Sequence, residues 1–172
     1  MERGETANEI FVVAATADLT IKVVDKEDPN TPLANAQVTV TDPYGNNKTV
    51  TTDANGEATL NDWAVGDSTV KINKVPSPNV IPTPDTSTAT VEKNSTNEHK
   101  VEAPKVTEKG NLTITVTDEL TGKKVPGAVV QVKDPSGNVS TKKTDSNGEI
   151  RLTNTPIGKY TVTITGVPDG YT

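Results

Sequence analysis

Acidic side chains cluster where the sequence first suggests a chemical site. The loop 25–28 carries three carboxylates, those of Asp25, Glu27 and Asp28. Oxygen ligands of this kind suit Ca²⁺, which takes about six to eight of them. The full spacing of a calcium-binding loop is absent, and aspartate is also an ordinary turn residue. Asp25, Glu27 and Asp28 are therefore weak calcium candidates, and we otherwise expect no metal and no other cofactor.

No group of residues has the types and spacing of a catalytic site. The chain has one histidine, His99, and no cysteine, which excludes a thiol nucleophile, a thiolate metal site and a disulfide. A lone histidine completes neither a usual zinc site nor a convincing Ser–His pair. We expect no catalytic residues and no enzyme activity, and we expect His99 to face solvent on a strand.

The only tryptophan, Trp63, stands in the segment Asn61-Asp62-Trp63-Ala64-Val65-Gly66. An exposed tryptophan suits contact with a glycan or a partner protein, because its ring buries much apolar area at one point. The alternative is that it packs over the end of a β-sandwich, and this is the alternative we favour. Trp63 is therefore a candidate ligand contact, and packing over the end of the sandwich is the alternative role.

Composition restricts the class of protein. Hydrophobic residues make up 31% and aromatic residues 3% of the 172 residues, and the formal net charge is -6. The apolar residues are mostly valine and isoleucine, with many threonines, and these β-branched types favour strands. The 17 basic residues are scattered among 23 acidic ones, so we expect no nucleic acid partner. No apolar run is long enough to span a membrane.

The clearest feature of the sequence is an internal duplication. The segment 19–76 recurs as 112–168, at an offset of 93 residues at its start and 92 at its end. Asp42-Pro43-Tyr44-Gly45 matches Asp134-Pro135-Ser136-Gly137, and the Asp-x-Asn-Gly-Glu motif at 53–57 matches that at 145–149. Matches at a nearly constant offset predict two tandem modules of one fold.

Each copy has the periodicity of short strands. Alternation of apolar and polar residues begins both copies, with the apolar positions Leu19, Ile21 and Val23 and their matches Leu112, Ile114 and Val116. Such alternation places one set of side chains in a core and the other in solvent. The Asp-Pro-x-Gly and Asp-x-Asn-Gly motifs supply the turns. The sequence therefore predicts an all-β protein of two tandem immunoglobulin-like β-sandwich modules.

A set of motifs in the second copy occurs together in one known family. The motifs are Gly110-Asn-Leu-Thr-Ile-Thr-Val-Thr-Asp118, Val125-Pro-Gly-Ala128, Thr144-Asp-Ser-Asn-Gly148, Gly158-Lys-Tyr160 and Val167-Pro-Asp-Gly-Tyr171. They resemble the B-type repeat of collagen adhesins, the prealbumin-like CnaB domains of Gram-positive adhesin stalks and pilins. The resemblance covers nearly all of both modules after Asp18, and it implies prealbumin-like sandwiches in a surface protein.

Many domains of that family carry a self-forming isopeptide bond. A lysine of the first strand attacks an asparagine or aspartate of the last, while a buried glutamate handles the protons. The resemblance places the lysine position at Val23 and Val116, and the glutamate position at Ile72 and Ile164. All four residues are apolar, so we predict that neither module forms the bond. The nearest lysine, Lys22, is one residue from the lysine position. Because side chains alternate between the two faces of a strand, we expect Lys22 to face solvent.

The two ends of the chain are out of phase with the duplication. The first module continues through strand-like segments at 88–92 and 98–102, which we interpret as a closing hairpin, and the second module has none. The apolar segment Asn8-Glu9-Ile10-Phe11-Val12-Val13-Ala14-Ala15 precedes the first module as 97–102 precedes the second. One interpretation is a fragment of a longer array. The other is a donor strand, with Ile10, Phe11, Val12, Val13 and Ala14 completing the second module of another copy.

The expected organisation is an extension with one apolar strand over 1–17, a sandwich over 18–104, a linker over 105–110 and a second sandwich over 111–172 without its closing hairpin. The proline-rich segment 77–87 is expected to be an extended loop crossing between sheets.

The expected function is that of a structural subunit or stalk segment of a prokaryotic cell-surface fibre, pilus or adhesin. Such a protein is extracellular, with copies of itself or neighbouring repeats as its partners. Two alternatives remain, an adhesin module that binds a host protein or glycan, and an accessory sandwich of a larger secreted enzyme.

Overall fold

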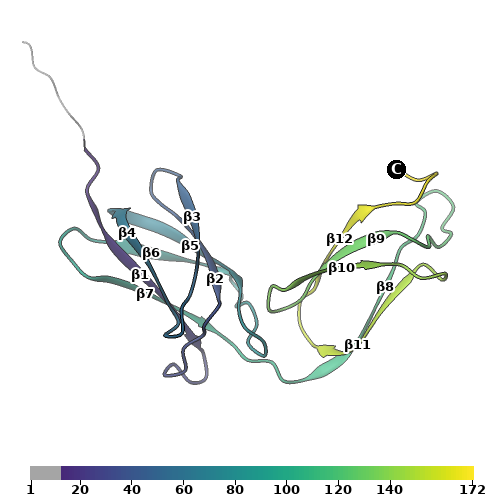
Figure 1. The fold of residues 1–172 in the computed structure, drawn as a ribbon, viewed down its shortest axis with the longest axis horizontal. Coiled ribbons are helices and arrows are strands. Elements are labelled where there is room, and N and C mark those ends of the chain that lie inside the picture. The colour runs from purple at the N-terminus through teal and green to yellow at the C-terminus, as the bar shows by residue number, and fades with distance from the viewer. Residues whose placement is uncertain (1–12) are drawn as a thin grey trace, which may run out of the picture.

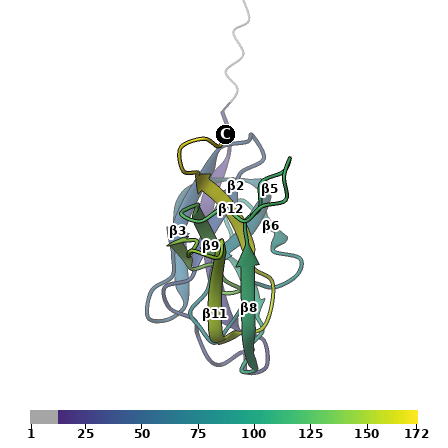
Figure 2. The same ribbon diagram turned by 90° about the vertical axis from the view of Figure 1, so that its right-hand side faces the viewer.

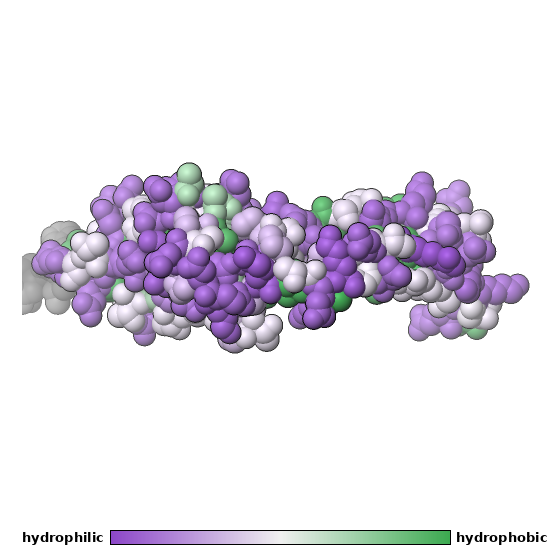
Figure 3. Space-filling view, turned by 90° about the horizontal axis from the view of Figure 1, so that it is seen from below, coloured by the Kyte–Doolittle hydropathy of each residue, from purple (hydrophilic) through white to green (hydrophobic). Residues whose placement is uncertain are grey.

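The chain folds into two β-sandwich modules placed along the long axis of the molecule (Figure 1). The structure, a computed structural model, describes residues 13–172, which form twelve strands. Within this range no helix could cross a lipid bilayer. The molecule is longer than it is wide, and the face seen in Figure 3 is mainly hydrophilic. The predicted all-β fold of two tandem modules is confirmed.

Module 1 is a sandwich of two sheets. The first sheet has the order β4-β1-β7, and the second has the order β3-β2-β5-β6. All neighbouring pairs are antiparallel except β1 and β7, which run parallel. The strands are β1 (Thr16–Asp25), β2 (Gln37–Thr41), β3 (Asn47–Thr51), β4 (Glu57–Ala64), β5 (Gly66–Lys74), β6 (Thr86–Val91) and β7 (Asn97–Ala103).

The core of module 1 follows the alternation of its strands. Leu19, Ile21 and Val23 of β1 point between the sheets and are at most 1% exposed. They meet the inward residues of β5, Val70 and Ile72, which are also 1% exposed. Burying an aliphatic side chain of this size stabilises the fold by about 1.5–3 kcal/mol. The pattern predicted from the sequence therefore accounts for the central layer of the module.

Module 2 repeats this plan with fewer strands. β11 pairs with β8 as β4 pairs with β1, and β9 lies between β10 and β12 as β2 lies between β3 and β5. Among residues 109–172 no strand corresponds to β6 or β7. The strands are β8 (Lys109–Thr115), β9 (Val129–Lys133), β10 (Val139–Lys143), β11 (Glu149–Pro156) and β12 (Thr161–Gly166).

The two last strands of module 1 do not form a hairpin, and that part of the sequence interpretation is wrong. β6 pairs with β5 in one sheet, whereas β7 pairs with β1 in the other. The Asn97 side chain holds the turn between them by donating to the carbonyls of Glu92 and Ser95, and it also donates to Asp18 of β1. Each strand completes a different sheet, and residues 109–172 contain no counterpart of either one.

His99 also departs from its expected place. It stands on β7, but it is half-buried rather than fully exposed, and its Nε2 lies 2.8 Å from the Ser87 Oγ of β6. Burial lowers the pKa of the imidazole. The single histidine thus links the two closing strands across the gap between the sheets.

The proline-rich segment after β5 does not cross between sheets as predicted. It joins β5 to β6, which are antiparallel neighbours in one sheet. Two such neighbours need only a short turn, so the length of this β5–β6 loop is not required by the topology of module 1. Its backbone instead contacts module 2, through Val75 and Ile81.

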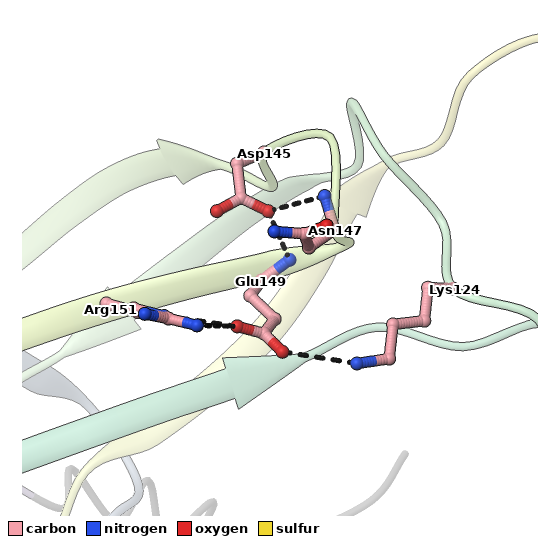
Figure 4. A network of polar contacts seen from close by, with 5 residues as sticks. All are labelled: Lys124, Asp145, Asn147, Glu149 and Arg151. Atoms are coloured by element: carbon pink, nitrogen blue, oxygen red, sulfur yellow. Dashed lines mark hydrogen bonds and ion pairs between the residues drawn. The ribbon is translucent and has the colours of Figure 1, made fainter.

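The Asp-x-Asn-Gly turns have the expected geometry. In module 2 the Asp145 Oδ1 accepts the N–H groups of Asn147 at 2.8 Å and of Glu149 at 3.0 Å (Figure 4). The Glu149 carboxylate pairs with Arg151 at 2.9 Å and Lys124 at 3.2 Å. Hydrogen bonds from the Glu149 and Asn147 N–H groups lower the pKa of Asp145. These acidic groups are therefore committed to shaping the turn.

Candidate functional site

The two modules meet at a joint built from backbone hydrogen bonds. Residues 134–137, the Asp-Pro-Ser-Gly turn of module 2, lie against the β5–β6 loop of module 1. The N–H of Val75 donates to the Ser136 carbonyl and that of Ile81 to the Pro135 carbonyl, each at 2.8 Å. The Ser136 hydroxyl donates to the Asn79 carbonyl at 2.6 Å. Three direct bonds between modules restrict their relative motion far more than a flexible linker would.

The loop on the module 1 side of the joint is itself held in place. Its other edge binds the linker, because the Val80 N–H donates to the Pro104 carbonyl and the Val106 N–H to the Pro78 carbonyl. The Asn79 side chain is 3% exposed and donates to the Ala103 carbonyl at the end of β7. The loop is thus fixed between the linker and the turn of module 2.

Gly137 allows the close approach of the two modules. It has a φ of +93°, and a Cβ at this position would overlap the Asn73 carbonyl oxygen and lie 2.8 Å from the Lys74 Cα. Its counterpart in module 1, Gly45, has a φ of +89° and nothing within 4 Å of the same point. Both glycines suit the turn, but only Gly137 is also required by a neighbouring module.

The preceding residue shows the same divergence. Ser136 is 3% exposed in the joint, whereas its counterpart Tyr44 is 67% exposed. No joint was predicted from the sequence, although the exchange of a large residue for a small one in otherwise matching turns was a visible signal. A tyrosine would not fit between the turn and Asn79, so the small side chain permits the contact.

An ion pair anchors the linker beside the joint. Lys105 Nζ lies 3.1 Å from the Asp25 carboxylate, which is almost fully buried at the end of β1. A hydrogen bond with the Glu27 side chain, helped by the Glu27 N–H and Lys105, lowers the pKa of Asp25 from its ordinary value of 3.8 to about 2. Asp25 therefore stays ionised and holds Lys105 over a wide pH range.

The other two calcium candidates lie in the same loop. Asp28 accepts hydrogen bonds from the Thr31 hydroxyl at 2.8 Å and the Asn30 N–H at 3.3 Å. The Glu27 N–H donates to Asp25. Over residues 13–172 no three His, Cys, Asp or Glu side chains converge as a metal site would need. Calcium binding here remains a prediction without a contact that supports it.

Replacing Asp25 with asparagine is expected to lower stability in a pH-dependent way. The depressed pKa means that ionised Asp25 stabilises the fold above pH 3.8 and that this contribution is lost as the pH falls towards 2. The urea midpoint of Asp25→Asn should therefore lie below that of the wild type near pH 6, with the difference closing near pH 2. Trp63 fluorescence follows the transition. A difference that stays constant between these pH values would refute this role.

Trp63 lies at the edge of the module 1 core. Its ring is half-buried against the core cluster, and its Nε1 donates to the Ser68 Oγ at 2.9 Å. In module 2 the matching residues are Thr155 and Tyr160, whose hydroxyl groups lie 2.6 Å apart. The large and small partners have exchanged positions while the hydrogen bond is kept. This arrangement favours the structural alternative for Trp63 over a role as a ligand contact.

The exchange can be tested by transplanting the module 2 pair into module 1. Trp63→Thr alone should destabilise module 1 by about 3 kcal/mol, because it removes a large packed ring. Adding Ser68→Tyr should recover about 1–2 kcal/mol through the coupling of the two sites. Circular dichroism during urea denaturation of the four proteins of the cycle measures the coupling. Purely additive losses would show that the two positions do not compensate.

The positions assigned to the isopeptide residues supply neither an amine nor a carboxyl group. Val23, Ile72 and Val116 are buried, with exposures of 0%, 1% and 7%. Lys22 lies on the outer side of its sheet and pairs with Glu57 at 3.8 Å, as its parity predicted. Ile164 differs from the others because it is 52% exposed.

The exposure of Ile164 belongs to a wider open face on module 2. Val162 is 42% exposed, although Val70 and Ile72, which match Val162 and Ile164, are 1% exposed. β8 pairs with β11 alone in the described sheet, as the end view in Figure 2 illustrates. The residues that β6 and β7 cover in module 1 therefore have counterparts in module 2 that no strand within residues 13–172 covers.

These features define a class, an all-β protein of two tandem sandwich modules joined by a fixed contact. Comparison with protein families gives a match to the SpaA prealbumin-like fold domain over residues 17–105, slightly more than half of the chain. A carboxypeptidase regulatory-like domain matches residues 111–170. The chain belongs to the family of prealbumin-like fold domains, and the resemblance seen in its sequence is confirmed.

Two solved structures are similar to this chain. A streptococcal ancillary pilin is 18% identical with a TM-score of 0.50, and the alignment covers 92% of this chain and 56% of the pilin. The TIE protein of Bacillus anthracis is 26% identical with a TM-score of 0.48, over 92% of this chain and 29% of that protein. This chain thus spans 29% and 56% of the lengths of these two proteins. No curated protein matches the sequence.

Proposed function

We propose that this chain is a structural segment of a prokaryotic cell-surface fibre, pilus or adhesin stalk that acts outside the cell. The observation that carries the proposal is the joint, where backbone hydrogen bonds fix one sandwich against the next. A segment whose modules keep a fixed relative orientation has a defined length and direction, and a stalk requires both. Family membership agrees with this role.

The topology of module 1 suits a segment under tension. The chain enters through β1 at Thr16 and leaves through β7 at Ala103, and these two strands are parallel neighbours. Pulling on the two ends therefore slides one strand along the other, and the ladder from Leu19↔Asn97 to Asp25↔Ala103 is loaded as a whole. Rupture requires many hydrogen bonds to break together rather than one after another.

The proposed partners are copies of this chain or neighbouring modules of the same fibre. Copies associate by strand donation, in which the N-terminal segment of one copy completes module 2 of another. Such a contact uses different surfaces on the two copies, and it therefore extends into an open filament rather than closing into a dimer.

Electron microscopy tests the structural role. Negative-stain images of the purified chain should show rods with the length of two modules, and filaments with that repeat as concentration rises. Antibodies against the chain should label the outer surface of the cells that produce it. Label confined to the cell interior, or globular particles of variable shape, would contradict the proposal.

One observation favours a second candidate, the adhesin module. A cleft of about 840 Å³ lies between the modules, with lysines from both of them along its walls. Lys26 and Lys100 come from module 1, and Lys133 and Lys159 from module 2. Asp85, Glu102 and Asp134 line the same cleft, so its charges are mixed and suit a polar glycan or peptide rather than a strongly acidic one. A glycan array read at physiological salt, with a Lys133→Glu/Lys159→Glu variant as control, tests this candidate, and specific retention lost in the variant would support it.

A further inference from the structure

We infer that the edge of β7 in the cleft between the modules binds an extended peptide, which pairs with Lys100 and Glu102 as an added antiparallel strand. The inference rests on the adhesin candidate and deepens it, because it names the ligand class and the contact. Addition of a strand to a sheet edge is a common way to bind a peptide, since backbone hydrogen bonds supply affinity and side chains supply selectivity.

The edge of β7 presents backbone groups to the cleft. β7 is the last strand of its sheet, so within residues 13–172 no strand lies on its other side. The Ala103 carbonyl faces β1, where it accepts the Lys26 N–H. Backbone groups alternate sides along a strand, so those of Lys100 and Glu102 face the open edge. Both residues line the cleft, and their N–H and carbonyl groups are thus available to a ligand.

The chain itself already places an extended segment along this edge. The β5–β6 loop runs antiparallel to the linker that follows β7, with Asn79 opposite Lys105. The Val80 N–H donates to the Pro104 carbonyl. Pro104 continues the alternation of the open-edge residues of β7, so the loop lies on the same side of the backbone as the inferred ligand. The loop is therefore an example, within module 1, of the contact that we infer.

The sequence of the loop explains why it does not fill the rest of the edge. After Val80 the Ile81 N–H turns to the Pro135 carbonyl of module 2, and Pro82 and Pro84 follow. Proline has no N–H and cannot donate to a strand beside it. The loop therefore leaves β7 here, and the cleft of about 840 Å³ opens between them. Ligand sites typically have volumes of about 300–1,000 Å³.

The exposed side chains of β7 determine the charge pattern of the ligand. Lys100 and Glu102 form no ion pair within residues 13–172. Opposite charges directly across neighbouring strands attract, and like charges repel. An antiparallel ligand therefore has a basic residue opposite Glu102 and, two residues later, an acidic residue opposite Lys100. The residue between them lies opposite Val101 and faces the core, so it is apolar.

A second copy of the chain does not fit this edge, although its own β7 has complementary charges. The segment 100–102 is Lys-Val-Glu, which is self-complementary when two β7 strands run antiparallel. That register places Glu98 of the second copy opposite Pro104, where Val80 already lies. The ligand is therefore a free peptide, or a flexible segment of a partner protein, whose chain turns away before it reaches Val80.

Fluorescence anisotropy of a synthetic peptide with the full chain tests the inference. The probe Thr-Lys-Val-Glu-Val-Lys, labelled at its C-terminus, places its first lysine opposite Glu102 and its glutamate opposite Lys100. Its binding should saturate below about 1 mM. The peptide Thr-Glu-Val-Lys-Val-Glu, with the charges exchanged, should bind at least about tenfold more weakly. The double variant Lys100→Glu/Glu102→Lys should reverse this preference.

Two controls separate the contact from effects on folding. Lys100 and Glu102 are exposed, so the double variant should unfold in urea as the wild type does, with Trp63 fluorescence as the readout. N-methylation of the peptide tests the backbone contact without changing the protein. The N–H of the peptide's glutamate points towards β7, whereas that of the preceding valine points away. N-methylation of the glutamate should abolish binding, and N-methylation of that valine should leave the affinity unchanged.

Equal affinity of the two peptides for the wild type would overturn the inference, and so would a preference that the double variant does not reverse. Absence of binding by either peptide would also overturn it. Retention of a glycan that Lys133→Glu/Lys159→Glu abolishes would then identify the cleft as a glycan site. In each case rods of fixed length by electron microscopy would leave the structural role standing, so the failures of the two proposals are distinguishable.

Discussion

Gly137→Ala is expected to release the two modules from their fixed orientation. The added Cβ would overlap the Asn73 carbonyl oxygen and crowd the Lys74 Cα, both of which are backbone atoms with little freedom to move. The turn would have to withdraw, and the hydrogen bonds of Val75 and Ile81 to it would break. Spin labels on Tyr44→Cys and Leu120→Cys, two exposed sites in different modules, would then give a distance distribution several times broader than the wild type.

Gly45→Ala is the matched control for this experiment. It introduces the same residue at nearly the same positive φ, at a local cost of about 1–2 kcal/mol, but nothing lies within 4 Å of the new Cβ. Its distance distribution should remain as narrow as that of the wild type. Equal broadening by both substitutions, or by neither, would show that Gly137 does not set the orientation.

Truncating matched isoleucines in the two modules is expected to give very different losses of stability. Ile72 is 1% exposed and Ile164 is 52% exposed, although they occupy the same position of the duplication. Ile72→Ala should therefore cost about 2–5 kcal/mol, as in other packed cores. Ile164→Ala should cost about 0.5 kcal/mol, which is typical of a surface site.

The two unfolding transitions can be assigned separately. Trp63 is the only tryptophan and lies in module 1, so its fluorescence reports that module during denaturation. Calorimetry at low protein concentration, where copies do not associate, reports both modules. Losses of similar size for the two substitutions would mean that the face of module 2 around Ile164 is not open in solution.

Most of the fold of each module could be predicted from the sequence, because its signals are local. The alternation of Leu19, Ile21 and Val23 and the Asp-x-Asn-Gly turns depend on residues close together in the chain. Because the module is duplicated, each of these patterns occurs twice in the sequence. Strands, turns and the apolar core of module 1 follow from such patterns.

The errors concern which distant segments meet. The segments at β6 and β7 are adjacent in sequence, and a hairpin was the local interpretation, but pairing with β5 and β1 places them in different sheets. The joint was missed for the same reason. The exchange of Tyr44 for Ser136 marks a difference between the two turns, but it does not identify the β5–β6 loop as the neighbour of Ser136 and Gly137.

The candidate sites show the same limit. The apolar residues at the isopeptide positions could be identified from the sequence, because they depend on residue type alone. The hydrogen-bond partner of Trp63 could not be predicted, because nothing in the sequence marks Ser68 as that partner. The relation becomes visible only when the structure shows Thr155 and Tyr160 as the exchanged pair. Ile10 to Val12 of the predicted donor strand lie outside the described residues, and Val13 and Ala14 precede β1 without forming a strand.

The most direct test of a fixed two-module segment is a set of backbone N–H residual dipolar couplings, measured on the full chain in a weakly aligning medium. Couplings from each module define an alignment tensor for that module. The joint seen here predicts one tensor of the same magnitude and orientation for both modules. Two tensors that differ in magnitude or direction would show that the modules move independently, and would contradict the account.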